Sequence, residues 1–438
     1  METSSSLLPP ACLMALALFG ASSTLQAADL REVYEQAKTY DSTYRAAQFD
    51  LEAAGKRVPL ARSAFRPQLT FGGEVGLSTL ADDGLGPYEE TALSLTLNQT
   101  LYNRANSKLL DQAELGVLQA EAQYAAVGQT LILRVATAYF DVLRAQANVE
   151  FSQSELQAIS RQREQAERRF DVGLVPITDV RSAQAQYDLA VAQEIAASNQ
   201  LSTAQEALLL ISGVETELLT PLADDLPLTP PDPADIDAWV TLAEDQNLEL
   251  VIAQLATDSS NTQVSIERAN RYPTLDLIGS AASTTTEQFG RNDADIAEIK
   301  LQLRLPILTG GRVNAQVAQA RAEALSAEQQ LISQQRATTQ QTRDAYRGVQ
   351  ASIARVRALR QALVSTQKSA EATEAGFRAG TRTSVETLQA LRDTFSARSD
   401  FSGARYDYII NTLNLKAASG TLTEGDIFAI NRFLAIAE

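Results

Sequence analysis

Hydrophobic and polar residues alternate along four short segments of the chain, which form two pairs. Residues 69–77 and 93–101 place mainly leucine, valine and phenylalanine on one face and mainly polar residues on the other. Residues 299–305 alternate in the same way, and residues 275–284 alternate less regularly. A period of two with one apolar face is typical of a strand that is half-buried or faces lipid. The pattern therefore predicts two β-hairpins.

Each predicted hairpin is followed by a helical pattern of unusual length. Residues 104–170 and 311–377 contain no proline, and as uninterrupted helices each would be roughly 100 Å long, at about 1.5 Å per residue. In the first of them, apolar side chains recur every seven residues, which is typical of a coiled coil. The shorter helical patterns, 29–64 and 178–211, together match the long helix in length. We therefore expect them to stack end to end as its antiparallel partner.

The two halves of the chain repeat each other at a constant spacing. Pro67 and Pro273 occupy equivalent positions 206 residues apart, and a glycine-containing turn recurs at nearly the same offset. The chain is therefore predicted to contain two copies of one unit, residues 28–219 and residues 238–438. Residues 220–237 contain five prolines and are predicted to link the two copies.

The first 27 residues have the layout of a secretory signal peptide, because an apolar run precedes a stretch of small and polar residues. The apolar run is too short to span a bilayer as a helix. A buried N-terminal helix is the alternative, since the segment before the run carries Glu2 and no basic residue. We expect residues 1–27 to be removed, and with them Cys12, the one cysteine of the chain.

The composition excludes several classes of function. The chain has no histidine and one cysteine, so we expect no histidine base, cysteine nucleophile, histidine-ligated metal or disulfide framework. The 37 Lys and Arg residues are outnumbered by 54 Asp and Glu residues, giving a net charge of −17, which argues against nucleic-acid binding. The sequence therefore predicts a protein without enzymatic activity, cofactor or metal.

Four strands are too few to close a barrel. Sheets that span a bilayer must close, because unpaired backbone groups find no water there, and bacterial outer-membrane barrels begin at about eight strands. The predicted barrel must therefore be shared, with eight strands from two chains or twelve from three. The strand count leaves both possibilities open.

Several segments form a specific set of motifs. The longest is Arg-Phe-Asp-Val-Gly-Leu-Val-Pro-Ile-Thr-Asp-Val at residues 169–180, a helix–turn–helix signature. The others are Thr-Leu-Ile-Leu at 130–133, Thr-Ala-Tyr-Phe at 137–140, Gly-Thr-Arg-Thr at 380–383 and Arg-Tyr-Asp-Tyr-Ile at 405–409. In these motifs and in its duplication, the chain closely resembles the TolC family of outer-membrane efflux channels. The resemblance covers nearly all of the chain after residue 28.

The resemblance implies a fold class and a set of partners. Family members are homotrimers in which each protomer gives four strands to a 12-stranded transmembrane β-barrel, continued by a long α-helical coiled-coil barrel. They lie among the lipids of the Gram-negative outer membrane and extend into the periplasm. The implied function is a passive exit duct that works with a periplasmic adaptor (membrane fusion) protein and an inner-membrane RND or ABC transporter. Drugs, other toxic small molecules and proteins of type I secretion are the implied cargo.

The resemblance also implies a gate at the periplasmic helix turns. Asp179 and Arg382 match a charged latch, in which the aspartate of the family archetype bonds a tyrosine and an arginine on neighbouring helices. Phe377 stands here in place of that tyrosine, so one bond of the latch is expected to be missing. Helix-end chemistry is the alternative for Asp179, with Thr178 as a neighbouring cap candidate.

Two further groups of residues are carried over by position. Glu386 and Gln389 match two aspartates that ring the narrowest part of the pore, and three copies of Glu386 would favour cations. An ordinary solvated helix face is the alternative for both residues. The implied adaptor-docking turns comprise Gly173, Leu174, Val175, Gly380 and Thr381.

Other classes of protein explain the sequence less completely. A soluble periplasmic coiled-coil adaptor or scaffold accounts for the seven-residue spacing but not for the four alternating segments. A hydrolase with paired carboxylates lacks support, because the acidic residues are spread along helices, without a phosphate-binding loop or a serine-nucleophile motif. Residues 82–87 are acidic and glycine-containing but do not have the spacing of a calcium loop, and we expect an extracellular hairpin loop there.

Overall fold

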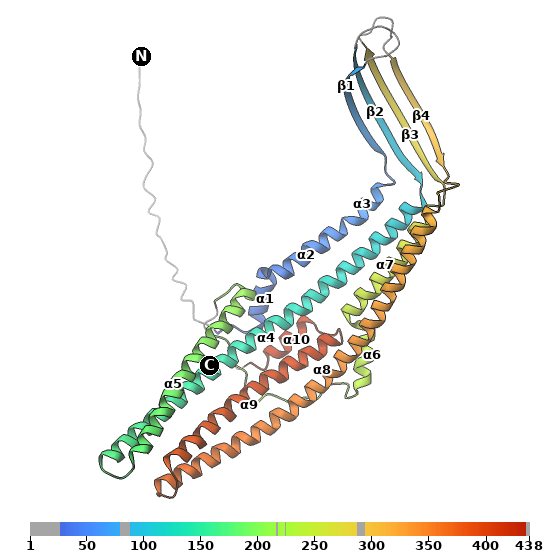
Figure 1. Cartoon of the computed structure of the whole chain (residues 1–438). Coiled ribbons are helices and arrows are strands. Elements are labelled where there is room, and N and C mark those ends of the chain that lie inside the picture. The colour runs from blue at the N-terminus through green and yellow to red at the C-terminus, as the bar shows by residue number, and fades with distance from the viewer. Residues whose placement is uncertain (1–26, 79–87, 216–217, 224, 287–293, 435–438) are drawn as a thin grey trace, which may run out of the picture.

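The structure of the chain, a computed structural model, describes residues 27–78, 88–215, 218–223, 225–286 and 294–434. The predicted hairpin loop 82–87 and all but the last residue of the predicted signal peptide lie outside these ranges. The described part is elongated, with a sheet at one end and two helical hairpins at the other (Figure 1).

Four antiparallel strands form one sheet in the order β1-β2-β3-β4, so both predicted β-hairpins are confirmed. The apolar face of this sheet has no cover within the described part of the chain: Leu69, Val75, Ile299 and Leu301 are 65 to 81% exposed. The outer strands β1 and β4 are each paired on one side only. The strands are β1 (Gln68–Ser78), β2 (Tyr88–Tyr102), β3 (Thr274–Thr286) and β4 (Ala294–Arg304).

Two long helices set the length of the molecule, as predicted. The helix α4 (Arg104–Asp171) has 68 residues and α8 (Arg312–Arg378) has 67. Along the lower part of the molecule, α4 packs against the antiparallel helix α5, and α8 packs against α9 (Figure 1). Along the upper part, α4 packs against α2 and α3, and α8 packs against α7. The expected end-to-end stacking is thus confirmed. The remaining long partners are α5 (Ile177–Ser212), α7 (Leu248–Ala269) and α9 (Ser384–Ala418).

The prediction of one continuous helix over residues 29–64 is wrong. Asp41 ends the first helix and caps the second, because its side chain accepts a hydrogen bond from the Tyr44 N–H at 2.8 Å. Asp41 is 4% exposed and pairs with Arg134 of α4 at 3.0 Å. The second break lies shortly before Pro59, which has no N–H to donate to the carbonyl four residues earlier in a continuous helix. The three helices are α1 (Leu30–Tyr40), α2 (Ser42–Gly55) and α3 (Arg57–Ser63).

The main hydrophobic core lies at mid-length, where α1, α4, α9 and the segment between the repeats meet. Phe140 of α4 stacks on Tyr406 of α9, with ring centroids 5.5 Å apart. The segment 220–237 packs into this core through Leu222 and Leu226, and its last two residues belong to α6 (Ile236–Gln246). A further short helix, α10 (Glu424–Asn431), also contributes to it. One stretch of α4 is apolar enough to cross a membrane by length and composition, and half of that stretch is buried in the molecule.

Candidate functional site

The two helix turns at the lower end of the molecule have the same backbone geometry. Two residues after the end of each long helix stands a glycine with positive φ, Gly173 at 76° and Gly380 at 77°. This conformation costs other residues about 1–2 kcal/mol. In each turn the next N–H donates to a carbonyl five residues earlier, which satisfies an otherwise unpaired group at the helix end. These bonds join Leu174 to Arg169 at 2.8 Å and Thr381 to Gly376 at 2.8 Å.

The first of these turns presents apolar side chains to solvent. Leu174 is 74% exposed and Val172 is 69% exposed. Val175 is half-buried and so less accessible than these two side chains. Gly173, Gly380 and Thr381 are exposed as well. Exposed apolar groups on a narrow tip are costly to leave in water, so this surface is suited to contact another protein.

Asp179 lies in the first turn of α5 and is half-buried. The helix begins at Ile177, and its N-cap is Pro176, which makes no side-chain capping bond. The prediction of Thr178 as a cap is therefore wrong, because the helix begins one residue before it. A carboxylate at the position of Asp179 is favourable next to the positive end of the helix dipole.

Arg382 pairs with Glu386 of the same helix end, at 3.0 Å. Its aliphatic stem covers Gly376, where an added Cβ would lie 2.7 Å from the Cγ of Arg382. Over the residues described here, no ion pair or hydrogen bond joins Arg382 to Asp179 within one chain. A latch between these two residues would therefore have to form between protomers.

Phe377 contacts the other coiled-coil tip. The guanidinium carbon of Arg169, in the last turn of α4, lies 4.6 Å from the centroid of the Phe377 ring, in the last turn of α8. This geometry is a cation–π interaction. Arg169 was not singled out from the sequence, although both residues stand about one turn before their glycine.

Glu386 has a local role at the start of α9. Its carboxylate accepts a hydrogen bond from the Thr383 N–H at 2.8 Å, and the Thr383 hydroxyl accepts one from the Glu386 N–H at 3.2 Å, which together form a capping box. The backbone bond from Thr383, then the bond from Arg382, lowers the pKa of Glu386 below its ordinary value. Gln389 is exposed and donates to Asp393 at 2.8 Å.

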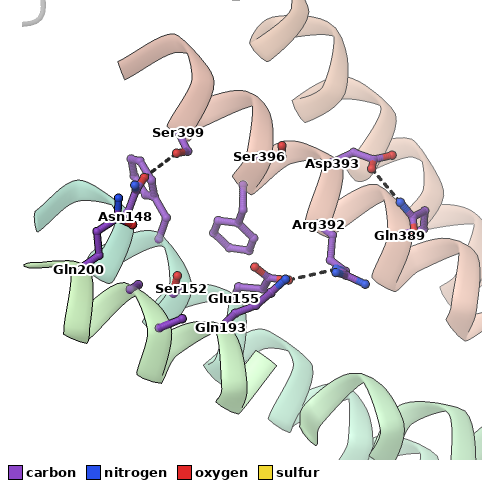
Figure 2. Close-up of a pocket in the computed structure, with 14 residues that line it drawn as sticks. Asn148, Ser152, Glu155, Gln193, Gln200, Gln389, Arg392, Asp393, Ser396 and Ser399 are labelled. Carbon is purple, nitrogen blue, oxygen red and sulfur yellow. Dashed lines mark hydrogen bonds and ion pairs between the residues drawn. The ribbon is translucent and has the colours of Figure 1, made fainter. Parts of the chain in front are cut away.

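A cavity of about 580 Å³ separates the first coiled coil (α4 and α5) from α9 of the second coiled coil (α8 and α9). Figure 2 shows that polar side chains from all three helices face it. The Ser399 hydroxyl donates to Asn148 at 2.6 Å, and Arg392 pairs with Glu155 at 3.2 Å. Burial raises the pKa of the Glu155 carboxyl, and the neighbouring Arg392 opposes that rise. Gln389, predicted from the sequence to belong to a pore ring, also lines this cavity, whereas the four residues that form these two contacts were not predicted.

No group of three or more histidine, cysteine, aspartate or glutamate side chains is placed to hold a metal ion in the described ranges. The described residues of the tips and the cavity form ion pairs, helix caps and cation–π contacts, among them Arg169 over Phe377 and Arg398 over Phe151. Such contacts can hold helices together reversibly, which suits a switch better than a reaction centre.

Comparison with known proteins gives consistent matches. The model of the family described as "Outer membrane efflux protein" matches residues 33–214 and 239–421. The outer membrane protein TolC of Escherichia coli strain K12 is 37% identical, over 97% of this chain and 88% of that protein. TolC of Vibrio cholerae is 38% identical, over 95% of this chain and 96% of that protein. The crystal structure of the outer membrane protein VceC from Vibrio cholerae has the same fold, with a TM-score of 0.75 at 20% identity, over 89% of this chain and 96% of that chain.

Proposed function

Because this chain belongs to the outer membrane efflux protein family, we propose that three copies close one barrel and form the exit duct of a tripartite export machine. The chain is an outer-membrane efflux duct whose helices extend into the periplasm. Its proposed partners are a periplasmic adaptor protein and an inner-membrane RND or ABC transporter. The proposed cargo is toxic small molecules, with secreted proteins as a second class.

The observation that carries this proposal is the unfinished sheet. The strands β1 and β4 each leave one edge unpaired, and the apolar side chains of the sheet are exposed. In water such a sheet would aggregate, and in a bilayer its open edges would leave backbone groups without hydrogen bonds. Pairing β1 of one copy with β4 of the next removes both edges, and three copies give twelve strands, within the range of outer-membrane barrels.

The helix tips are the proposed periplasmic gate of this duct. Asp179 and Arg382 are called the tip latch below. Asp179 lies in the first turn of α5 and Arg382 in the turn just before α9, and among the contacts of the described residues they do not pair within one chain. We assign their contact to neighbouring protomers of the trimer. The exposed turns with Leu174 and Gly380 are the proposed adaptor contact, and Glu386 is the proposed acidic ring of the pore.

Membrane extraction tests the proposal directly. The protein should remain in the outer-membrane fraction until detergent is added, and should then run as a trimer that persists in detergent until it is heated. Light scattering in detergent, corrected for the bound micelle, measures the number of chains. A protein that leaves the membrane fraction in buffer as a monodisperse monomer would overturn the proposal and favour a soluble periplasmic scaffold.

A further inference from the structure

Below the main core, the two coiled coils contact each other through a minor apolar cluster and through polar side chains. A minor hydrophobic cluster joins Ile159 of α4, Ala190 of α5 and Leu388 of α9. Farther up, the cavity of Figure 2 separates the same helices, and the bond between Asn148 and Ser399 closes it on another side. This region therefore lacks the continuous apolar packing of the mid-length core.

Arg392 is the residue that connects all three helices there. Its Nε lies 3.2 Å from Oε1 of Glu155 on α4, and its Nη1 donates to Oε1 of Gln186 on α5 at 2.8 Å. The side chain of Glu155 is 14% exposed and that of Arg392 is 30% exposed. The ion pair with Glu155 is thus partly shielded from solvent, and charge-assisted bonds are stronger there than on an open surface. We call Arg392, Glu155 and Gln186 the Arg392 bridge.

We propose that the Arg392 bridge is a second latch of the duct: Arg392 is a positioning residue that holds the second coiled coil against the first, and its release is part of opening. The inference rests on the proposed function, in which the tips separate to open the periplasmic end. It adds a contact within one protomer to the tip latch between protomers.

The geometry suits a contact that breaks and re-forms. Separating packed apolar helices exposes surface to water, at a cost that grows with the area exposed. The Arg392 bridge instead lies beside a cavity lined by polar side chains, where water can replace its hydrogen bonds when it opens. Arginine fits the position because its planar fork binds two acceptors at once, whereas lysine is a point charge.

Single-channel conductance of the full chain in planar bilayers tests the role of Arg392. Losing one partner of a charged hydrogen bond typically shifts a two-state equilibrium tenfold or more. Arg392→Gln should therefore raise the ratio of open to closed time by at least that factor. Glu155→Gln should act in the same direction, and the double variant should add little to either. Arg392→Lys should lie between the wild type and Arg392→Gln.

The matched control is Arg168→Gln. Arg168 pairs with Glu164 at 3.1 Å within α4 and is 77% exposed, so its loss removes a charge of the same kind without disconnecting two helices. The conductance of the Arg168→Gln variant should equal that of the wild type.

A covalent cross-link between α9 and α5 tests whether the Arg392 bridge acts as a latch or only as a structural contact. Cysteines introduced as Arg392→Cys and Gln186→Cys would be unique, because Cys12 lies in the predicted signal peptide and the chain has no other cysteine. The reduced double variant should show the raised open fraction, and a short bis-maleimide linking the two thiols should lower it again. A tether that leaves the raised conductance unchanged overturns the proposal.

The same recordings distinguish failure of the Arg392 bridge proposal from failure of the proposed duct function. If Arg392→Gln forms an intact trimer with wild-type conductance while Arg382→Ser opens the channel, the bridge only packs the helices and the tip latch stands. If the wild-type protein forms no trimer and conducts no ions, the proposed function itself fails.

Discussion

Replacing Phe377 by leucine tests the contact between the coiled-coil tips. Leucine keeps an apolar side chain in α8 but removes the aromatic ring that lies 4.6 Å from the Arg169 guanidinium. A cation–π interaction contributes about 0.5–1 kcal/mol at exposed sites. In a trimer that opens in one step, three lost contacts amount to about 1.5–3 kcal/mol, a shift of about 10- to 150-fold in the opening equilibrium.

Single-channel recording measures that shift as the fraction of time spent in the high-conductance state. Phe377→Leu and Arg169→Gln should each raise this fraction, and the double variant should not exceed the larger single effect, because both remove one contact. Phe377→Tyr should lower the conductance slightly, since it keeps the ring and restores the hydroxyl of the family latch.

The control for this prediction is Phe428→Leu. Arg31 lies over the Phe428 ring at 4.8 Å, far from the tips at mid-length, so the same chemistry is lost without a change at the gate. The reasoning is refuted if Phe377→Leu leaves the open fraction unchanged in an intact trimer, because the ring contact would then have no part in closure.

Four further predictions concern the gate, the pore and the repeat. Arg382→Ser and Asp179→Ala should each raise single-channel conductance, and the double variant should add little; unchanged conductance in both would leave only helix-end roles for these residues. Glu386→Gln should reduce cation selectivity, seen as a smaller reversal potential in a KCl gradient, and should also weaken the cap of α9. Because burial raises the pKa of Glu155, acidification should protonate this carboxyl at a higher pH than an ordinary glutamate and raise conductance, whereas Glu155→Gln should remove that component of the pH response. Gly420→Ala should lower the temperature at which the trimer dissociates, because φ is +77° there and the new Cβ would lie 2.1 Å from the carbonyl oxygen of Gln246 at the end of α6.

The repeated elements could be predicted from the sequence because each has a strong local signal. Alternation with an apolar face identified the two β-hairpins. The absence of proline identified α4 and α8, and a seven-residue spacing supported α4. The family and the fold class, assigned from motifs such as residues 169–180, are confirmed by the comparisons. These features depend on residues that are close together in the chain.

The features that were missed depend on contacts between distant residues. Arg392 and Glu155 are more than 200 positions apart, and their contact depends on the rotation of two helices, which periodicity leaves undetermined. The break at Asp41 is stabilised partly by Arg134, on another helix. Two prolines were nevertheless local signals: Pro59 for the second break, and Pro176 for the true start of α5.

The open edges of the sheet have a consequence for genetics. Since β1 and β4 each have one edge unpaired within the described sheet, each chain of the proposed trimer supplies an edge to two neighbours. A variant chain that folds but cannot pair its β1 or β4 edge would therefore prevent closure of every barrel into which it assembles. When such a variant is expressed in equal amount with the normal protein and mixes at random, only about one trimer in eight consists of normal chains alone. Mutations on these two strands should thus be dominant, whereas mutations that prevent folding altogether should be recessive.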